Sequence, residues 1–97
     1  MYRIEVSPAA DRDLEKLKGR IRRQDFERLR AAVGNLAREP RPHREPRPHA
    51  VRKIKGETQA YRIRVGSYRI VYEVYDKDNL VLILQIARRS ETTYRQI

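Results

Sequence analysis

The residues best suited to chemistry are three arginines, Arg62, Arg64 and Arg69. They flank Gly66-Ser67 in a stretch where apolar and polar residues alternate, which is typical of two strands joined by a tight turn. In such a hairpin Arg64 faces Arg69, and Arg62 lies diagonal to Arg69. Like charges that face each other destabilise a sheet by roughly 0.2–1 kcal/mol. We interpret the cluster as an anion site, with phosphate as the favoured ligand; a solvated basic face is the alternative.

Three strands in a meander carry these arginines. The pattern predicts strands over residues 61–65, 68–75 and 80–86, with a polar turn at 76–79. The hairpin register pairs Val65 with Tyr68, Ile63 with Ile70 and Tyr61 with Tyr72, on an apolar face opposite the arginines. The last strand is almost entirely apolar, as expected for a strand buried on both faces.

The chain before the meander predicts one strand and two helices. Residues 2–6 alternate as a half-buried strand, and Ser7-Pro8 is typical of a helix start, with Ser7 as the N-cap. The first helix is expected to end near Gly19, and the second to run from about residue 21 or 24 to Arg38, before Pro40. Both have apolar stripes at helical spacing, so we expect an antiparallel helical hairpin over one face of the sheet.

A tandem hexapeptide joins the helices to the meander. Residues 39–44 read Glu-Pro-Arg-Pro-His-Arg, and 45–50 read Glu-Pro-Arg-Pro-His-Ala. Its prolines favour an extended linker. His43 and His49 could suggest a metal or catalytic site, but no acidic or cysteine cluster accompanies them, so we expect no metal and no cofactor. Residues 51–55 are expected to form a short strand or an extended lead-in.

Together these elements predict an α+β fold in one domain, residues 1–97, with the repeat at 39–50 inside it. An N-terminal strand and an antiparallel helical hairpin would pack on one face of a mainly antiparallel, twisted sheet of four or five strands. The arginines would lie on the other face.

Composition limits the possible functions. The chain has 97 residues and a net charge of +10, from 23 Lys and Arg against 13 Asp and Glu. This charge favours nucleic acid or an acidic protein as partner. The sequence contains no cysteine, which excludes thiolate catalysis and disulfides. It has no apolar run long enough to span a membrane and begins with a strand pattern, so we expect a cytoplasmic protein without a membrane partner.

Several motifs make the chain similar to the RelE/ParE superfamily of type II toxin–antitoxin toxins. They are Tyr-Arg-Ile-Glu-Val-Ser-Pro-Ala-Ala at 2–10, Val-Arg-Lys-Ile-Lys-Gly at 51–56, Gly-Ser-Tyr-Arg-Ile-Val-Tyr at 66–72 and Ile-Ala-Arg-Arg-Ser-Glu at 86–91, with Tyr94-Arg95 beyond. The resemblance covers nearly the whole chain and implies the RelE-like fold. The motif at 66–72 is its most specific part.

For the RelE branch, the resemblance implies a ribosome-dependent endoribonuclease that cleaves mRNA in the ribosomal A site. The catalytic positions of the family correspond here to Arg62, Arg64, Arg69, Arg89 and Tyr94. We further expect phosphate contacts from Arg52, Lys53, Lys55 and Arg88. Better-studied members have lysines at positions 62 and 64, and arginine is a good phosphate clamp but a poor base. A simple register turns Arg88 rather than Arg89 toward the cluster, so a twist or bulge must decide between them.

The resemblance also implies partners. A small, acidic cognate antitoxin would lay a helix, and often a strand, over the toxin; the ribosome and mRNA would be its targets, and operator DNA would be bound only through the antitoxin complex. Two other functions remain open. One is a ParE-like toxin that inhibits DNA gyrase without cutting RNA, because the same fold hosts both. The other is a basic binding module without toxicity.

Overall fold

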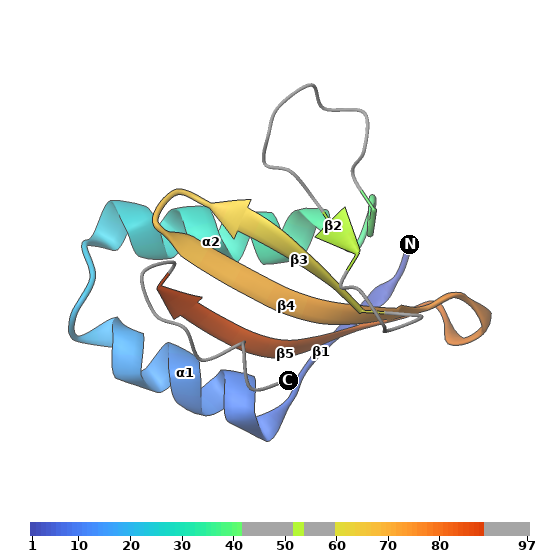
Figure 1. The fold of residues 1–97 in the computed structure, drawn as a ribbon, viewed down its shortest axis with the longest axis horizontal. Helices are drawn as coiled ribbons and strands as arrows, with labels where there is room; N and C mark the ends of the chain where they lie inside the picture. Colours follow the sequence, from blue (N-terminus) through green and yellow to red (C-terminus); the bar gives the residue numbers. More distant parts are fainter. Residues whose placement is uncertain (42–51, 54–59, 89–97) are drawn as a thin grey trace.

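Two helices pack on a five-stranded sheet in the computed structural model, which describes residues 1–41, 52–53 and 60–88 (Figure 1). The elements are β1 (Arg3–Val6), α1 (Pro8–Lys18), α2 (Arg23–Asn35), β2 (Arg52–Lys53), β3 (Ala60–Val65), β4 (Tyr68–Tyr75), the 3-10 turn η1 (Asp76–Asp78) and β5 (Leu80–Arg88). The strand order is β1-β5-β4-β3-β2. Among the strands of the described residues, only β1 and β5 form a parallel pair. The predicted α+β architecture is confirmed.

The first helix begins and ends where the sequence predicts. The Ser7 side chain accepts a hydrogen bond from the Ala10 amide at 3.1 Å, Pro8 occupies the first turn, and Gly19 is the C-cap. The second helix is shorter than predicted, because α2 stops at Asn35 and the next residues form a turn. No helix of the described residues is long and apolar enough to cross a membrane.

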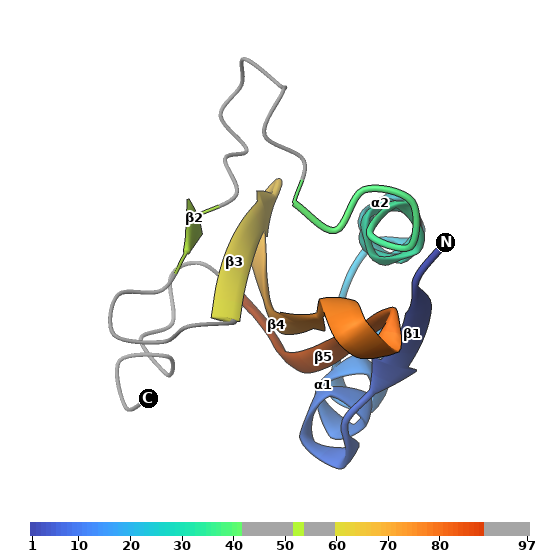
Figure 2. The ribbon, with the colours of Figure 1, turned by 90° about the vertical axis from the view of Figure 1, so that its right-hand side faces the viewer.

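The core lies between the helices and one face of the sheet. Ala10 of α1, Leu29 of α2 and the α2 C-cap Leu36 belong to this core. From β4 and β5 it includes Tyr68, Ile70, Tyr72, Val74, Val81, Ile83 and Ile86. Figure 2 shows α2 beside β3 and β4, and α1 next to β5 and β1. Successive side chains of a strand point to opposite faces. The residues that alternate with the core residues of β4, and their cross-strand partners on β3, therefore lie on the far face of the sheet, turned away from the helices.

The hairpin register agrees with the prediction at every predicted pair. Val65 pairs with Tyr68, Ile63 with Ile70, Tyr61 with Tyr72, and Arg64 with Arg69. Gly66 has φ +60°, which favours glycine because it has no Cβ to clash. The hairpin therefore sets which residues share a face.

A β-bulge in β5 changes the faces of the residues that follow it. Tyr72 pairs with Ile83 but Val71 pairs with Gln85, so Leu84 is the extra residue. Ile83 and Ile86 are both buried in the core, at 0% and 3% exposure. Strict alternation would put residues three apart on opposite faces, and the bulge brings both to the core face. The expectation that β5 is buried on both faces is only partly met, because Leu82 and Leu84 are half-buried.

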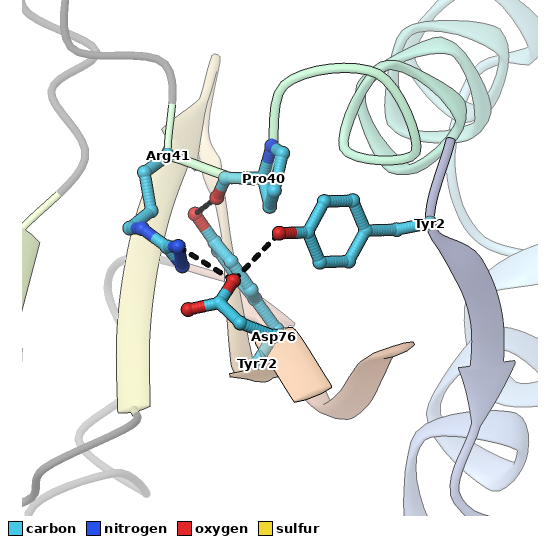
Figure 3. Close-up of polar contacts among 5 residues, drawn as sticks. All are labelled: Tyr2, Pro40, Arg41, Tyr72 and Asp76. Carbon is cyan, nitrogen blue, oxygen red and sulfur yellow. Dashed lines mark hydrogen bonds and ion pairs between the residues drawn. The ribbon is translucent and has the colours of Figure 1, made fainter. Parts of the chain in front are cut away.

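Polar contacts connect the β4–β5 turn to the chain after α2 (Figure 3). Asp76 accepts a hydrogen bond from the Tyr2 hydroxyl at 2.6 Å and forms an ion pair with Arg41 at 2.7 Å. The Tyr72 hydroxyl donates to the Pro40 carbonyl at 2.8 Å. Burial raises the pKa of Tyr72, so this hydroxyl remains a donor well above neutral pH. Most of the tandem repeat, with His43 and His49, lies outside the described residues.

Candidate nucleic-acid interface

Three arginines lie on the far face of the hairpin and form what we call the arginine face: Arg62, Arg64 and Arg69. Arg64 is the cross-strand partner of Arg69, and Arg62 is the partner of Val71. Arg64 is exposed, while Arg62 and Arg69 are half-buried. Two facing guanidinium groups repel each other in the absence of an anion. The arrangement is therefore suited to a ligand with negative charge.

The arginines of this face have cross-strand partners in the neighbouring strands, and each line of partners across the sheet is called a row. Arg52 of β2 pairs with Arg62, so one row runs from Arg52 through Arg62 to Val71 and then to Gln85 of β5. Ala87 pairs with Arg69 and adds a small residue beside that guanidinium.

Glu73 is a residue of the far face that the sequence reasoning missed. It pairs with Ala60 and Leu82, one row beyond Val71, and its carboxylate accepts a hydrogen bond from the Tyr75 hydroxyl. This hydrogen bond raises the pKa of Tyr75. Counting alternate residues from Arg69 would have found Glu73. It places an acidic side chain at the border of the basic region.

The other predicted residues are not all brought to this face. Arg88 pairs with Tyr68, so it lies on the helix side, with its guanidinium carbon 5.9 Å from the centre of the Tyr68 ring. The simple register that would turn Arg88 toward the arginines is wrong, because the bulge at Leu84 reverses the alternation. Lys53 pairs with Tyr61. The predicted residues that lie outside the described ones are Lys55, Arg89 and Tyr94.

The chemistry of this face is electrostatic. Guanidinium groups stay protonated at any ordinary pH and donate paired hydrogen bonds to phosphate oxygens. They can stabilise negative charge that develops in a transition state. No group of three metal-binding side chains occurs within residues 1–41, 52–53 and 60–88.

Comparisons with known proteins agree on the class defined by this fold and basic face, a small toxin of a toxin–antitoxin system. Residues 4–93 match the family model described as ParE toxin of type II toxin–antitoxin system, parDE. The chain thus belongs to the ParE toxin family, within the RelE/ParE superfamily.

Individual relatives give the same result. Toxin RelG of Mycobacterium tuberculosis is 33% identical over 94 residues, which cover 93% of this chain and 93% of RelG. The crystal structure of the archaeal RelE–RelB complex from Pyrococcus horikoshii OT3 matches with a TM-score of 0.73 and 28% identity, covering 94% of this chain and 98% of that one. The RelBE2 toxin–antitoxin complex of M. tuberculosis matches with a TM-score of 0.70 and 25% identity, covering 93% of each chain.

Proposed function

We propose that this toxin inhibits translation by cleaving mRNA in the ribosomal A site, with the arginine face holding the phosphate that is attacked. One observation carries the proposal: the register pairs Arg64 with Arg69, and Arg62 lies diagonal to Arg69. Like charges that face each other are unfavourable in a sheet, and a phosphate between the guanidinium groups would offset that repulsion. The similarity to RelG and to the archaeal RelE chain adds support.

The proposed reaction is attack by a ribose 2′-oxygen on the adjacent phosphorus. The bond from phosphorus to the 5′-oxygen of the next nucleotide breaks, which leaves a cyclic phosphate and a 5′-hydroxyl. Arg69 and Arg89 would neutralise the charge that develops on the phosphorane, and Tyr94 would stack on a base. The 2′-hydroxyl loses a proton, and the leaving 5′-oxygen gains one from solvent water. Arginine does not serve as a base at neutral pH, so water would accept the first proton.

Dependence on the ribosome follows from this weak base. A site that supplies cations but no efficient base gains most in cleavage rate when the ribosome holds the RNA in a reactive geometry. Free RNA would therefore be cut far more slowly than mRNA held in the A site.

The decisive experiment adds purified chain to a cell-free translation reaction and maps mRNA ends by primer extension. We expect new 5′ ends only when ribosomes translate. Arg69→Ala should lower the cleavage rate at least about 100-fold, the scale for losing one donor to a developing charge. Arg23→Ala, an exposed arginine at the start of α2, is the matched control and should cleave normally. Full cleavage by folded Arg69→Ala protein would reject the proposal.

Inhibition of DNA gyrase is the second candidate, because the matching family model describes ParE toxins. A supercoiling assay separates the two. Blocked supercoiling together with intact mRNA in the translation reaction would favour gyrase. Normal growth of cells that express the chain alone would instead support a basic binding module.

We also propose a cognate acidic antitoxin as partner, since two similar solved structures are RelE–RelB type complexes. A cleft of about 250 Å³ lies between α1 and α2, with Leu14, Leu29 and Val33 in its walls. Val6 also lines it and is 41% exposed. An amphipathic helix would cover these apolar side chains, and its acidic face would complement the charge of the toxin. The product of the neighbouring reading frame should co-purify with the toxin and abolish its effect on translation.

A further inference from the structure

A second basic site lies where α1 runs along β5 (Figure 1). It is a cleft of about 270 Å³ whose polar and small lining residues include Asp13, Lys16, Arg20, Gln85, Ala87 and Arg88. Three of these side chains are cationic and one is acidic. We call it the α1–β5 cleft.

The cleft exists because β1 is shorter than β5. Among the described residues, no strand pairs with β5 on this edge beyond Ile83. The first turns of α1 take over the edge: the Ser7 hydroxyl donates to the Leu84 carbonyl at 3.3 Å, and Asp13 accepts from the Ile86 amide at 2.9 Å. The Asp13 carboxylate is thus held by the backbone and keeps its negative charge, and the three cations of the lining outnumber it.

Two cations reach the cleft from the end of α1. Lys16 lies in the last turn of the helix and Arg20 directly after its C-cap Gly19, and both line the cleft and are exposed. Arg88 approaches from the end of β5, where it lies over the Tyr68 ring at 5.9 Å. The aromatic face reduces the freedom of that guanidinium and so lowers the entropy lost on binding an anion.

The α1–β5 cleft is continuous with the arginine face. Ala87 lines the cleft and is the cross-strand partner of Arg69, and Gln85 lines it and is the partner of Val71. Adjacent strands lie only about 4.8 Å apart, so the backbone of Arg69 is one strand away from the cleft. A chain with regularly repeated negative charges could occupy both sites at once.

We infer that the α1–β5 cleft binds a backbone phosphate of the same RNA strand whose scissile phosphate lies on the arginine face. The inference rests on the proposed function and extends it by a subsite for the flanking RNA. A phosphate fits better than an acidic peptide, because the cleft is small and its walls offer cations beside Gln85, with Leu17 and Ile86 as the apolar contributions. Alternation puts Ala87 and Arg88 on opposite faces, and the bulge at Leu84 decides that Ala87 is the one on the side of Arg69.

The test measures binding of oligouridylate RNA to the full chain, without ribosomes, over a range of salt concentrations. Each phosphate contact on a single strand adds about 0.7 to the slope of log affinity against log salt. The variant Lys16→Ala/Arg20→Ala should lose about 0.7 or more of this slope. The control Lys18→Ala/Arg23→Ala removes one lysine and one arginine from other exposed positions and should keep the wild-type slope.

Comparison with Arg69→Ala separates this inference from the proposed function. A lower slope for both Arg69→Ala and the cleft variant supports both sites. If only Arg69→Ala lowers the slope, the arginine face binds RNA and the cleft inference is overturned. If only the cleft variant does, the cleft stands and the proposed role of the arginine face fails. Equal losses in the cleft variant and its control would show a net-charge effect and overturn the inference. Binding of a polyglutamate peptide gives one more comparison. If the cleft variant keeps the wild-type salt slope for RNA but binds polyglutamate more weakly, the cleft belongs to an acidic protein and the inference is overturned.

Discussion

The two faces of the β3–β4 hairpin are made by alternate residues of the same two strands, yet they differ in kind. On the helix side, Ile63 pairs with Ile70 and Tyr61 with Tyr72, and both Ile70 and Tyr72 are fully buried. On the far face, Arg64 pairs with Arg69. Burial stabilises the first set by about 1.5–3 kcal/mol for each large side chain, whereas the second set brings like charges face to face. The far face also buries Val71, at 2% exposure. Both faces therefore contribute apolar burial, and the pairing of the arginines is the feature for which we proposed a phosphate ligand.

The largest expected effect comes from neighbouring residues of β5 that point to opposite faces. Ile83→Ala should lower the free energy of unfolding by about 2–5 kcal/mol, because it leaves a cavity in the core. Leu82→Ala, whose side chain is half-buried on the far face, should cost clearly less. Denaturant titration of both variants measures the difference. Equal losses would mean that the far face contributes to the core as much as the helix face does.

A substitution of Tyr72, on the helix face, should change the free energy of unfolding by less than Ile83→Ala does. Tyr72→Phe removes the hydrogen bond to the Pro40 carbonyl and should cost about 1 kcal/mol. Tyr75→Phe, which removes a hydroxyl bound to Glu73 at the surface, should cost less. Denaturation at neutral pH ranks the two variants, and the opposite ranking would contradict the importance of the Pro40 contact.

Alkaline pH tests the same hydroxyl through its charge. The pKa of Tyr72 is raised in the folded protein above the usual value of 10.0, chiefly by burial, so the folded state holds the proton more tightly than the unfolded state. Its contribution to stability is complete below about pH 10 and is lost as pH rises toward the folded pKa, by up to about 1.4 kcal/mol per pH unit. Stability curves from pH 8 to pH 11, as a rough working range, should fall more steeply for wild type than for Tyr72→Phe. Parallel curves would argue against burial as the cause.

The smallest expected change in stability comes from the arginine face and has the opposite sign. Arg64→Glu replaces a repulsive cross-strand pair with an attractive one and should raise the free energy of unfolding by about 0.2–1 kcal/mol. The same change should weaken RNA binding and inhibition of translation. Denaturant titration and the translation reaction measure the two effects. A variant that is less stable but fully active would show that the pair serves the fold rather than a ligand.

Local rules in the sequence were sufficient for much of this structure. The start of α1 at Ser7-Pro8 depends on a cap that only neighbouring residues form, and the hairpin register depends on the two residues at Gly66-Ser67. These signals placed Arg62, Arg64 and Arg69 on one face before any tertiary contact was considered. Glu73 was available to the same counting and was missed.

The tertiary structure alone decided the end of β5. Strict alternation from Leu80 would put Arg88 on the same face as Arg69, but the core takes both Ile83 and Ile86, and Leu84 bulges so that both can be buried. The parallel pairing of β1 with β5 likewise depends on segments far apart in the chain. The sequence thus determined the local turns, caps and alternation, because these depend on adjacent residues. Packing of the helices on the sheet determined where alternation breaks, because burial of apolar side chains outweighs the regularity of one strand.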